Sequence, residues 1–426
     1  MTNFVQWFRG SSPYIQAHRN KTFVINFGGE MLKDESFKNL IHDFALLKSL
    51  GIRLVLVHGI RPQIDARLEK LNHQACFHNR LRITDDVALQ CVKEAAGFVR
   101  VEIEALLSMG LANSPMANAE LKVASGNFIV AKPIGVIDGI DYANTGAVRK
   151  INSAAIHAQL EQQNLVLISP IGYSPSGDVF NLSAEHVATA VAIALNAEKL
   201  IFLTEESCVD ANGDLIAQLT TDELKQNTTL NFSLQAAIES CEAGIARVHL
   251  INRHIDGALL QELFTRDGVG TLVSAKPYEI CRAATLNDIG GILELIKPLE
   301  QQGILAKRSR EKIEMEISDY IVLERDGLII GCTALHVNAV ENCAIIACLA
   351  VHVDYRGSAR GQRLFLTALE NAKKQNLKTL FVLSTQTVQW FVERGFEHGD
   401  FDNLPDFLKA LYNPQRNSKI LFKILE

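Results

Sequence analysis

Apolar runs that alternate with helical patterns dominate the first 275 residues of this 426-residue chain. The runs TFVINF, IRLVLVHG, NLVLISPIG and KLIFLT are apolar almost throughout, which is typical of parallel strands buried on both faces. Segments with helical periodicity, such as residues 184–199, lie between them. This alternation predicts a doubly wound, mainly parallel α/β sheet, so we expect ligands at the carboxyl ends of its strands.

The pattern changes near residue 275. Thr285 and Asp288 have the spacing of a capping box in front of an apolar helix. Asp326-Gly327 predicts a tight hairpin, and the run AIIACLAVHV predicts a third strand. The helix that follows carries residues 364, 365, 368, 369 and 372 on one apolar face. We therefore expect a linker near residues 272–280, between a domain over 1–275 and an α+β domain over 281–426.

Composition excludes several classes of protein. The net charge of −6 argues against a nucleic-acid partner. No run approaches the roughly 18 to 20 apolar residues that a membrane span needs, and the N-terminus lacks the apolar region of a signal peptide. The eight cysteines show neither paired nor metal-binding spacing. We expect reduced thiols, a cytoplasmic location, no membrane association and no metal.

The stretch LAVHVDYRGSARGQRLFLTAL is the most informative in the chain. A strand ends, small residues follow, and a helix begins, so backbone N–H groups and the helix N-terminus can approach a pyrophosphate. The loop resembles the acetyl-CoA loop of the GNAT acetyltransferase superfamily, R/Q-x-x-G-x-G/A. Residues that this resemblance assigns to acetyl-CoA are Arg356, Gly357, Ser358, Ala359, Arg360 and Gly361, with Cys348, Leu349 and Val351 on the preceding strand.

The resemblance extends over essentially the whole chain. The segments ATLNDIGGILELIKPLEQQGIL, KRSREKIE, LFVLSTQTVQWFVERGF and LYNPQRNSKIL are similar to bacterial N-acetylglutamate synthases. That family joins an amino-acid-kinase-like domain to a GNAT domain, which agrees with the two patterns above. The resemblance implies transfer of acetyl from acetyl-CoA to the α-amine of L-glutamate, the first step of L-arginine biosynthesis.

Site residues follow from the same resemblance. Arg308 and Arg416 would bind the two carboxylates of glutamate, since guanidinium groups match carboxylates in geometry. The backbone N–H groups of Cys348 and Leu349, expected at the end of a strand, would stabilise the oxyanion of the thioester. We expect the Cys348 thiol itself to be a buried small apolar group. Ser384 would form a hydrogen bond to the sulfur of coenzyme A.

The general base is missing from its family position. Ile345 stands where the family has a glutamate, and isoleucine cannot accept a proton. Glu341 would lie about 13 Å away along an extended strand, and the odd spacing of His352 turns it to the other face. If Val337 opposes Ala344, then His336 lies directly across from position 345, with the Cβ atoms about 5 Å apart. His336, or a water that it holds, is therefore a hypothesis for the base; alternatively, His336 only packs and activity is reduced.

The first domain resembles the amino-acid kinases, most closely acetylglutamate kinase. FVINFGGE, LVHGIRPQID, VFNLSAEHVA and LIFLTEESCV match its motifs, and Gly28-Gly29 keep the strand-to-helix turn. Phosphoryl transfer depends on positioning and on charge stabilisation. Each charged or phosphate-binding element is changed, which predicts that the kinase is inactive. The changed positions are Asn26 for a lysine, Ile60 and Arg61 in a triple glycine, Glu185 for an aspartate, and Glu205-Glu206 for an Asp-Val pair.

The remaining use of this domain would be regulation. Arginine-inhibited kinases of the family carry an N-terminal tyrosine and the motif H-x(12)-E-x(5)-G, matched here by Tyr14, His249, Glu262 and Gly268. Glu262 would bind the guanidinium of L-arginine. The resemblance thus implies feedback by L-arginine and a homo-oligomer, with a hexamer as its expected form. Two alternatives stay open: an arginine sensor with impaired acetyltransferase activity, and an active acetylglutamate kinase with an appended domain.

Overall fold

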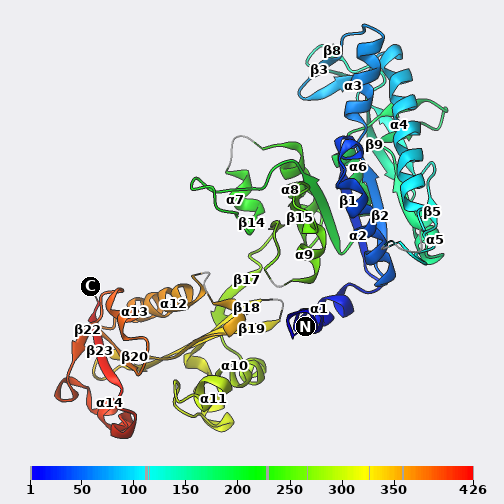
Figure 1. Ribbon diagram of the computed structural model, residues 1–426. Coiled ribbons are helices and arrows are strands. Elements are labelled where there is room, and N and C mark those ends of the chain that lie inside the picture. The colour runs from blue at the N-terminus through cyan, green and yellow to red at the C-terminus, as the bar shows by residue number, and fades with distance from the viewer. Residues whose placement is uncertain are drawn as a thin grey trace. The chain divides into compact units, whose positions relative to one another are not determined.

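The computed structural model describes residues 2–110, 114, 116–226, 230–265, 267–325, 327–356 and 359–425. The chain forms two compact units, Met1–Pro277 and Tyr278–Glu426 (Figure 1). Two strands occupy most of the predicted linker, because β16 (Thr271–Ser274) ends the first unit and β17 (Glu279–Ala283) begins the second. The connection between them is therefore only residues 275–278. No helix in the described ranges has the length and apolarity to cross a membrane.

An eight-stranded sheet forms the centre of the first unit. Its inner strands pair in parallel, with β15 and β16 as an antiparallel pair near one edge. The predicted doubly wound, mainly parallel sheet is thus confirmed. In order across the sheet the strands are β14 (Gln218–Thr220), β16, β15 (Val248–Asn252), β13 (Lys199–Thr204), β1 (Thr22–Phe27), β2 (Arg53–His58), β10 (Leu165–Ile168) and β5 (Val123–Ala124).

Smaller sheets complete the strand set of this unit. A four-stranded sheet has the order β12 (Val179–Asn181), β11 (Ile171–Tyr173), β6 (Ile129–Pro133) and β9 (Gly146–Ile151). Two hairpins are β3 (Cys76–His78) with β4 (Leu81–Ile83), and β7 (Val136–Ile137) with β8 (Ile140–Asp141).

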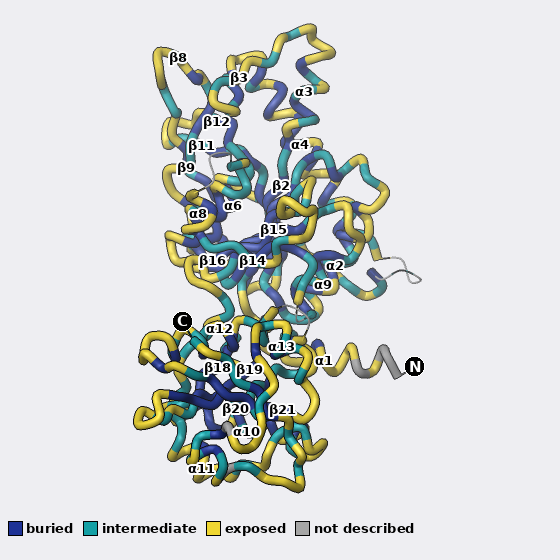
Figure 2. Tube along the Cα trace, turned by 90° about the vertical axis from the view of Figure 1, so that its left-hand side faces the viewer, coloured by how far each residue is buried: buried dark blue, intermediate teal, exposed yellow. Residues whose placement is uncertain are grey.

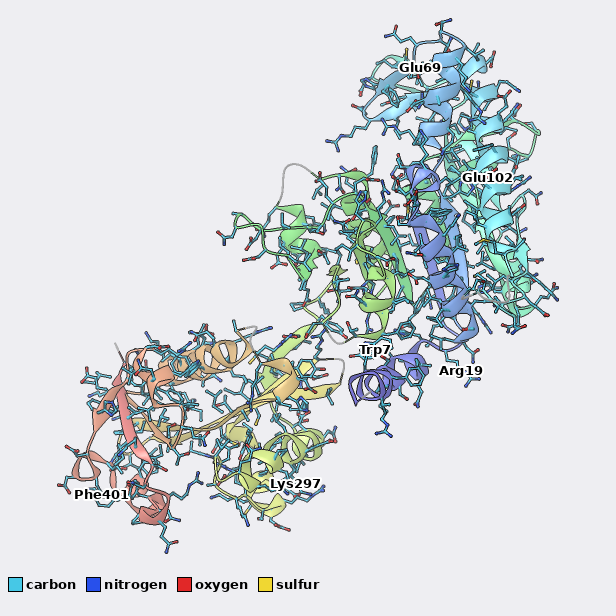
Figure 3. All side chains as sticks on the ribbon, in the orientation of Figure 1. Trp7, Arg19, Glu69, Glu102, Lys297 and Phe401 are labelled. Atoms are coloured by element: carbon cyan, nitrogen blue, oxygen red, sulfur yellow. The ribbon has the colours of Figure 1, made fainter. Side chains whose placement is uncertain are left out.

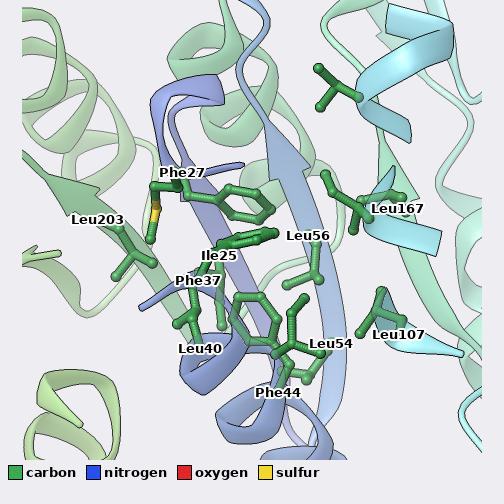
Figure 4. Packing of buried hydrophobic residues seen from close by; sticks show 14 of the residues in the cluster. Ile25, Phe27, Phe37, Leu40, Phe44, Leu54, Leu56, Leu107, Leu167 and Leu203 are labelled. Carbon is green, nitrogen blue, oxygen red and sulfur yellow. The ribbon is translucent and has the colours of Figure 1, made fainter. Parts of the chain in front are cut away.

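Alternate residues of each central strand enter two different apolar cores. Ile25 and Phe27 of β1 belong to one core and Val24 to the other, and all three are fully buried. Figure 4 shows the first core, where Phe37 and Phe44 from one helix pack on Ile25 and Phe27. Burial on both faces explains why these strands read as continuous apolar runs, and Figure 2 shows them as the darkest part of the unit.

Helices cover both faces of this sheet. The helix predicted over 184–199 is shorter than expected, because α6 ends at Ala194 and Asn196 takes a positive φ of 46° before β13 begins at Lys199. The helices of the unit are α1 (Thr2–His18), η1 (Gly29–Lys33), α2 (Phe37–Ser49), α3 (Arg61–Lys70), α4 (Asp86–Leu107), α5 (Ser153–Glu161), α6 (Ala184–Ala194), α7 (Thr221–Lys225), α8 (Phe232–Glu242) and α9 (Ala258–Phe264).

A seven-stranded mixed sheet forms the second unit. Its hairpin between β18 and β19 is the predicted one; Gly327 has a φ of 76°, while Asp326 lies outside the described residues. In order the strands are β17, β18 (Tyr320–Arg325), β19 (Leu328–Asn338), β20 (Cys343–Val351), β21 (Thr379–Ser384), β23 (Lys419–Ile424) and β22 (Glu397–Gly399).

The helices of the second unit lie on two sides of its sheet. Asp288 accepts hydrogen bonds from the backbone and hydroxyl of Thr285 (2.7 and 2.9 Å), so the predicted capping pair forms. The predicted apolar face of α12 packs on one side of the sheet, and α10 packs on the other. The helices are η2 (Leu286–Asp288), α10 (Ile289–Gln301), α11 (Arg310–Met315), η3 (Ile317–Asp319), η4 (Val353–Tyr355), α12 (Arg360–Lys374), α13 (Val388–Val392), η5 (Phe401–Asn403), α14 (Asp406–Leu411) and η6 (Pro414–Arg416).

Candidate active site

A bulge interrupts β20 at Cys348. This residue has a φ of 54°, and the register between β19 and β20 shifts between Cys332 and Ala334. One strand of a bulged pair has an extra residue, which bends the strand and redirects its peptide groups. Cys348 was expected at the end of a strand, whereas β20 continues past it to Val351.

Side chains of β19 fix the direction of the bulged peptides. The hydroxyl of Thr333 donates to the carbonyl oxygen of Ala347 (3.3 Å), and the thiol of Cys332 donates to that of Cys348 (3.5 Å). In a trans peptide the N–H points opposite to the C=O. The N–H groups of Cys348 and Leu349 therefore point away from β19.

The neighbouring strand leaves room on that side. β20 pairs with β21 only as far as Ile346 and Val382, although both strands continue further. Beyond this pair the two strands separate, next to the bulge. Two redirected N–H groups at an opening between parallel strands are suited to stabilise negative charge on a carbonyl oxygen.

Ser384 lies at the end of β21. Its hydroxyl is buried, accepts the backbone N–H of Thr387 (3.0 Å) and lies 3.0 Å from the hydroxyl of Thr387. The side chain thus holds the turn that follows β21.

The predicted cofactor loop leads into α12. Ala359 precedes the helix with a φ of 52°, and Gly361 lies in the first turn. Arg356 is exposed and donates to the carbonyl of Val351 (3.3 Å). Gly357 and Ser358 lie outside the described residues. The guanidinium of Arg360 is paired with the carboxylate of Glu279 (2.6 Å), and the side chain is about nine-tenths buried. This positive charge is therefore already neutralised within the protein and is not free to bind acetyl-CoA.

The two arginines predicted for the substrate meet at one loop. Arg308 donates from its guanidinium to the carbonyl of Ala306 (2.9 Å), and Arg416 donates to those of Ile304 and Gly303 (3.0 and 3.2 Å). This loop follows α10, and the arginines come from positions 108 residues apart in the sequence. Two guanidinium groups near one loop can bind a molecule with two carboxylates.

Arg308 also acts on the bulge. The pKa of the Cys348 thiol is lowered, first by its interaction with the side chain of Cys332 and, against the effect of burial, by the charge of Arg308. The thiol itself is buried in an apolar cluster, as expected. Arg308 is thus close enough to the bulge for its charge to be felt there.

The predicted register of His336 is confirmed. It lies directly across from Ile345, and Val337 lies across from Ala344. Ile345 is buried in an apolar cluster with Phe381 and Leu408. The two other candidates for the base are engaged elsewhere: Glu341 accepts from Asn338 and from the backbone N–H of Asp406 (2.7 and 3.2 Å), and His352 accepts from that of Asp354 (3.4 Å).

Two carboxylates beside His336 were not predicted. Asp319 Oδ2 lies 2.8 Å from Nδ1 of the imidazole, and Glu316 Oε2 lies 3.9 Å from Nε2. Both come from the turn between α11 and β18, which no motif of the chain singles out.

The strand-to-helix corner of the first unit keeps its shape without a cation at Asn26. The buried amide of Asn26 donates to the carbonyl of Val57 (3.2 Å), inside the sheet. A Cβ on Gly29 would lie 2.8 Å from the carbonyl of Gly59, so glycine is needed for this close approach. Ile60 is buried in the core, and the guanidinium of Arg61 lies 4.9 Å from the centre of the Phe77 ring.

Acidic residues face the same corner. It borders a cavity of about 420 Å³, whose lining includes Gly28, Glu185, Glu205 and Glu206. Glu185 accepts the hydroxyl of Ser183 at the start of α6 (2.7 Å), and Glu205 pairs with Arg253 (2.6 Å). These partners are protein groups, so the two carboxylates already have roles within the fold.

His249, Glu262 and Gly268 of the predicted arginine site come together. Glu262 Oε1 lies 2.6 Å from His249 Nδ1, and Oε2 accepts the N–H groups of Val269 and Gly270 (2.8 Å each). Burial alone would raise the pKa of Glu262, but the hydrogen bond and charge of His249, with these N–H groups, lower it. Gly268 has a φ of 65° and its Cα faces the carboxylate.

Tyr14 lies on α1, one helical turn before His18. The His18 ring reaches the carbonyl of Leu263 (2.9 Å), the residue next to Glu262. Burial, with the charge of Lys199, lowers the pKa of His18 to about 4 although the hydrogen bond to Leu263 opposes this. The four residues predicted for arginine thus come from one region, and both oxygens of Glu262 are engaged there.

Comparisons with known proteins agree with this organisation. Residues 21–252 match the amino acid kinase family, and residues 291–396 match the acetyltransferase (GNAT) family. The amino-acid acetyltransferase of Ectopseudomonas mendocina is 49% identical over 432 residues, covering 100% of both chains. That of Yersinia pseudotuberculosis serotype O:1b is 48% identical, covering 99% of this chain and 98% of its own.

Solved structures of relatives show similarity over the same two domains. N-acetylglutamate synthase from Neisseria gonorrhoeae, complexed with coenzyme A and L-arginine, superimposes with a TM-score of 0.85, at 38% identity and 99% coverage of both chains. The same enzyme complexed with coenzyme A and N-acetyl-glutamate gives a TM-score of 0.64 at the same identity and coverage. This chain belongs to the amino-acid acetyltransferase family, in which an amino acid kinase fold precedes a GNAT acetyltransferase domain.

Proposed function

We propose that this enzyme transfers acetyl from acetyl-CoA to the α-amine of L-glutamate, and so catalyses the first step of L-arginine biosynthesis. The bulge at Cys348 carries the proposal, because it turns two N–H groups toward the opening between β20 and β21. The relative from Neisseria gonorrhoeae, bound to coenzyme A and N-acetyl-glutamate, supports this choice of substrates.

Acetyl-CoA fits the groups along this opening. The N–H groups of Cys348 and Leu349 would polarise the thioester carbonyl and stabilise its oxyanion. Val351 and the start of α12 would bind the pyrophosphate through backbone N–H groups and the helix N-terminus. Arg356, Ala359 and Gly361 contribute there, with Gly357 and Ser358. Arg360 would contribute its backbone rather than its side chain, which pairs with Glu279.

Glutamate would be held by its two carboxylates. Arg308 and Arg416 each keep guanidinium N–H groups beyond those that hold the loop after α10, and both are half-buried. Partial burial strengthens their attraction to a carboxylate. With the carboxylates fixed, the α-amine can be oriented toward the thioester.

The amine must lose a proton before it attacks. His336, or a water that it holds, would accept it, because Asp319 engages Nδ1 and leaves Nε2 as the acceptor. The thiolate of coenzyme A leaves readily, since thiols have a reference pKa of about 8.5. Ser384 would donate a hydrogen bond to this sulfur.

The first unit would bind L-arginine as a feedback effector. His249, Glu262 and Gly268 support this site, with Tyr14 on α1 close by. The guanidinium of arginine would compete with His249 for the carboxylate of Glu262, so binding would favour a different local arrangement. We further propose that the corner at Asn26 no longer transfers phosphate, because a buried amide replaces the cation there.

A homo-oligomer, with a hexamer as its form, completes the proposal. Helix α1 exposes three apolar side chains, Val5, Trp7 and Phe8. Trp7 is labelled in Figure 3. Apolar side chains that are exposed together on one helix are typical of an interface. A cytoplasmic location is also proposed, since the eight cysteines are free thiols, as in reducing compartments.

Release of coenzyme A with L-glutamate, measured with and without L-arginine, tests the proposal. We expect release that depends on glutamate and that arginine lowers. Arg416→Lys should raise the KM for glutamate at least tenfold, with little change in the KM for acetyl-CoA. Calorimetric binding of arginine without any release would instead indicate an arginine sensor. Consumption of ATP with N-acetylglutamate would indicate an active kinase.

A further inference from the structure

Two buried polar atoms in the described part of the second unit have no hydrogen-bond partner. They are Oε2 of Glu316 and the hydroxyl of Tyr320. A buried polar atom left unpaired costs about 1–3 kcal/mol, so such atoms are rare in folded proteins. Glu316 Oε2 lies 3.9 Å from Nε2 of His336, and the centre of the Tyr320 ring lies 6.3 Å from that of the imidazole, with the ring planes at 82°. Unpaired atoms at one place indicate a site for a polar group of a ligand.

The local fold directs these atoms inward. Glu316 ends α11, and its other oxygen, Oε1, lies 3.9 Å from the ammonium of Lys312 one helical turn earlier. Tyr320 begins β18 and is fully buried. Asp319 between them accepts from His336 Nδ1 at 2.8 Å. Because a carboxylate only accepts, Nδ1 carries the hydrogen and Nε2 keeps its lone pair on the side of Glu316.

The same cluster reaches the acetyl-transfer bulge. Burial raises the pKa of Tyr320, with the charges of Cys348, Cys332 and Glu316 adding to the effect and that of Arg308 opposing it. Tyr320 is therefore within electrostatic reach of both the bulge and Arg308. An amino-acid substrate whose carboxylate is bound by Arg308 would present its amine near this cluster.

We infer that Glu316 and Tyr320 bind the α-ammonium of the amino-acid substrate and that His336 accepts its proton, in place of a carboxylate at position 345. This inference rests on the proposed function. The ammonium donates to Glu316 Oε2 and to the oxygen of Tyr320, which satisfies both unpaired atoms. Asp319 is a positioning residue that holds the tautomer of His336.

The proposed acetyl transfer balances in protons and electrons. Nε2 of His336 takes the first proton from the ammonium, and the amine nitrogen then attacks the thioester carbon. The C–N bond forms, the C–S bond breaks, and the electron pair leaves with the sulfur. The nitrogen gives up its second proton as the amide forms, and this proton goes to the thiolate to give coenzyme A. His336 returns its proton to water, so each turnover releases one proton.

Glu316→Gln in the full chain tests the inference, with Glu314→Gln as the control. Both glutamates lie on the same short segment, but Glu314 is exposed. At pH 7 we expect Glu316→Gln to lower kcat/KM for glutamate at least 100-fold, because the ammonium loses the carboxylate that holds it beside His336 Nε2. Glu314→Gln should stay within twofold of the wild type.

A second variant separates catalysis from folding. Ile345→Glu, added to Glu316→Gln, returns a carboxylate directly across from His336. The double variant should have a kcat/KM for glutamate at least tenfold above that of Glu316→Gln. Binding of coenzyme A, measured by calorimetry, should be unchanged in all variants. Equal rates for Glu316→Gln and Glu314→Gln, or no recovery in a double variant that binds coenzyme A, would overturn the inference. A wild-type protein that never releases coenzyme A with glutamate would defeat the proposed function itself.

Discussion

Two of the histidine–glutamate pairs among the described residues, one in each unit, differ in how completely their polar atoms are used. In the first unit, Glu262 and His249 are 2.6 Å apart and less than a tenth exposed, and both carboxylate oxygens accept hydrogen bonds. In the second, Glu316 and His336 are 3.9 Å apart, 30% and 21% exposed, and one oxygen has no partner. The first pair is closed and the second is open.

This difference separates two uses of the same residue types. A fully satisfied buried network fixes one arrangement of the chain, so it can hold a fold or switch between states. An open pair keeps a lone pair and a carboxylate oxygen for a ligand, at a cost in stability. We therefore expect substitutions in the closed pair to lower stability, and those in the open pair to lower activity.

The largest predicted effect is on stability. Glu262→Ala should destabilise the first unit by about 3–5 kcal/mol, because it leaves His249 and two buried N–H groups without their partner. Glu316→Ala should change the stability of the second unit by less than about 1 kcal/mol, since its inner oxygen is already unpaired. Hydrogen exchange in β15 and β18 reports the two units separately.

The exposed Glu239→Ala on α8 is the control for this comparison and should leave both exchange rates unchanged. Equal losses of protection for Glu262→Ala and Glu316→Ala would contradict the distinction between a closed and an open pair.

A smaller effect is expected at the glycine beside the closed pair. Gly268→Ala places a methyl group at a φ of 65° and against Oε2 of Glu262, whereas Gly213→Ala places one at a φ of 87° in open space. The backbone strain is common to both, so their difference isolates the collision with Glu262. We expect Gly268→Ala to cost about 2 kcal/mol more, as overpacking typically does.

Inhibition assays give the functional side of this prediction. Gly268→Ala should weaken inhibition by L-arginine at least tenfold, and Gly213→Ala should not change it. Unaltered inhibition in Gly268→Ala would remove Glu262 from the proposed effector site.

Much of the open site could be predicted from sequence, because it depends on pairing between adjacent strands. The register of His336 against Ile345 follows from two strands joined by a short loop, where alternation of faces allows few solutions. Its partners Glu316 and Asp319 could not be predicted. They come from a turn 17 residues or more before His336, and a carboxylate in a turn carries no pattern of its own.

Other differences between the predictions from sequence and the structure also have physical causes. The bulge at Cys348 requires a positive φ at a residue that is not glycine, which the sequence does not mark. The side chain of Arg360 pairs with Glu279, 81 residues away, and local spacing gives no information on such a contact. The helix over 184–199 was predicted too long because its apolar periodicity continues past Ala194, whereas the backbone of Asn196 ends it.

The smallest predicted effect is on stability and concerns Asp43, a carboxylate that is not paired with a histidine. Burial, with the nearby charge of Asp256, raises the pKa of Asp43 to about 7. The folded state then binds a proton more tightly than the unfolded state, so stability falls as pH rises from about 4 to about 7. Asp43→Asn should remove this dependence and stabilise the first unit above pH 7 by about 1 kcal/mol, a value reduced for solvent screening.

Thermal unfolding between pH 5 and pH 8 measures this difference. The advantage of Asp43→Asn should be small at pH 5 and should grow as pH rises, because only the charged form of Asp43 is unfavourable. Asp222→Asn, an exposed aspartate on α7, should follow the wild type at every pH. An advantage that is constant with pH would show that the substitution acts through packing. Asp43 would then not show how much an unpaired carboxylate lowers the stability of the fold. The loss of stability caused by the open pair would have to be measured at Glu316 itself.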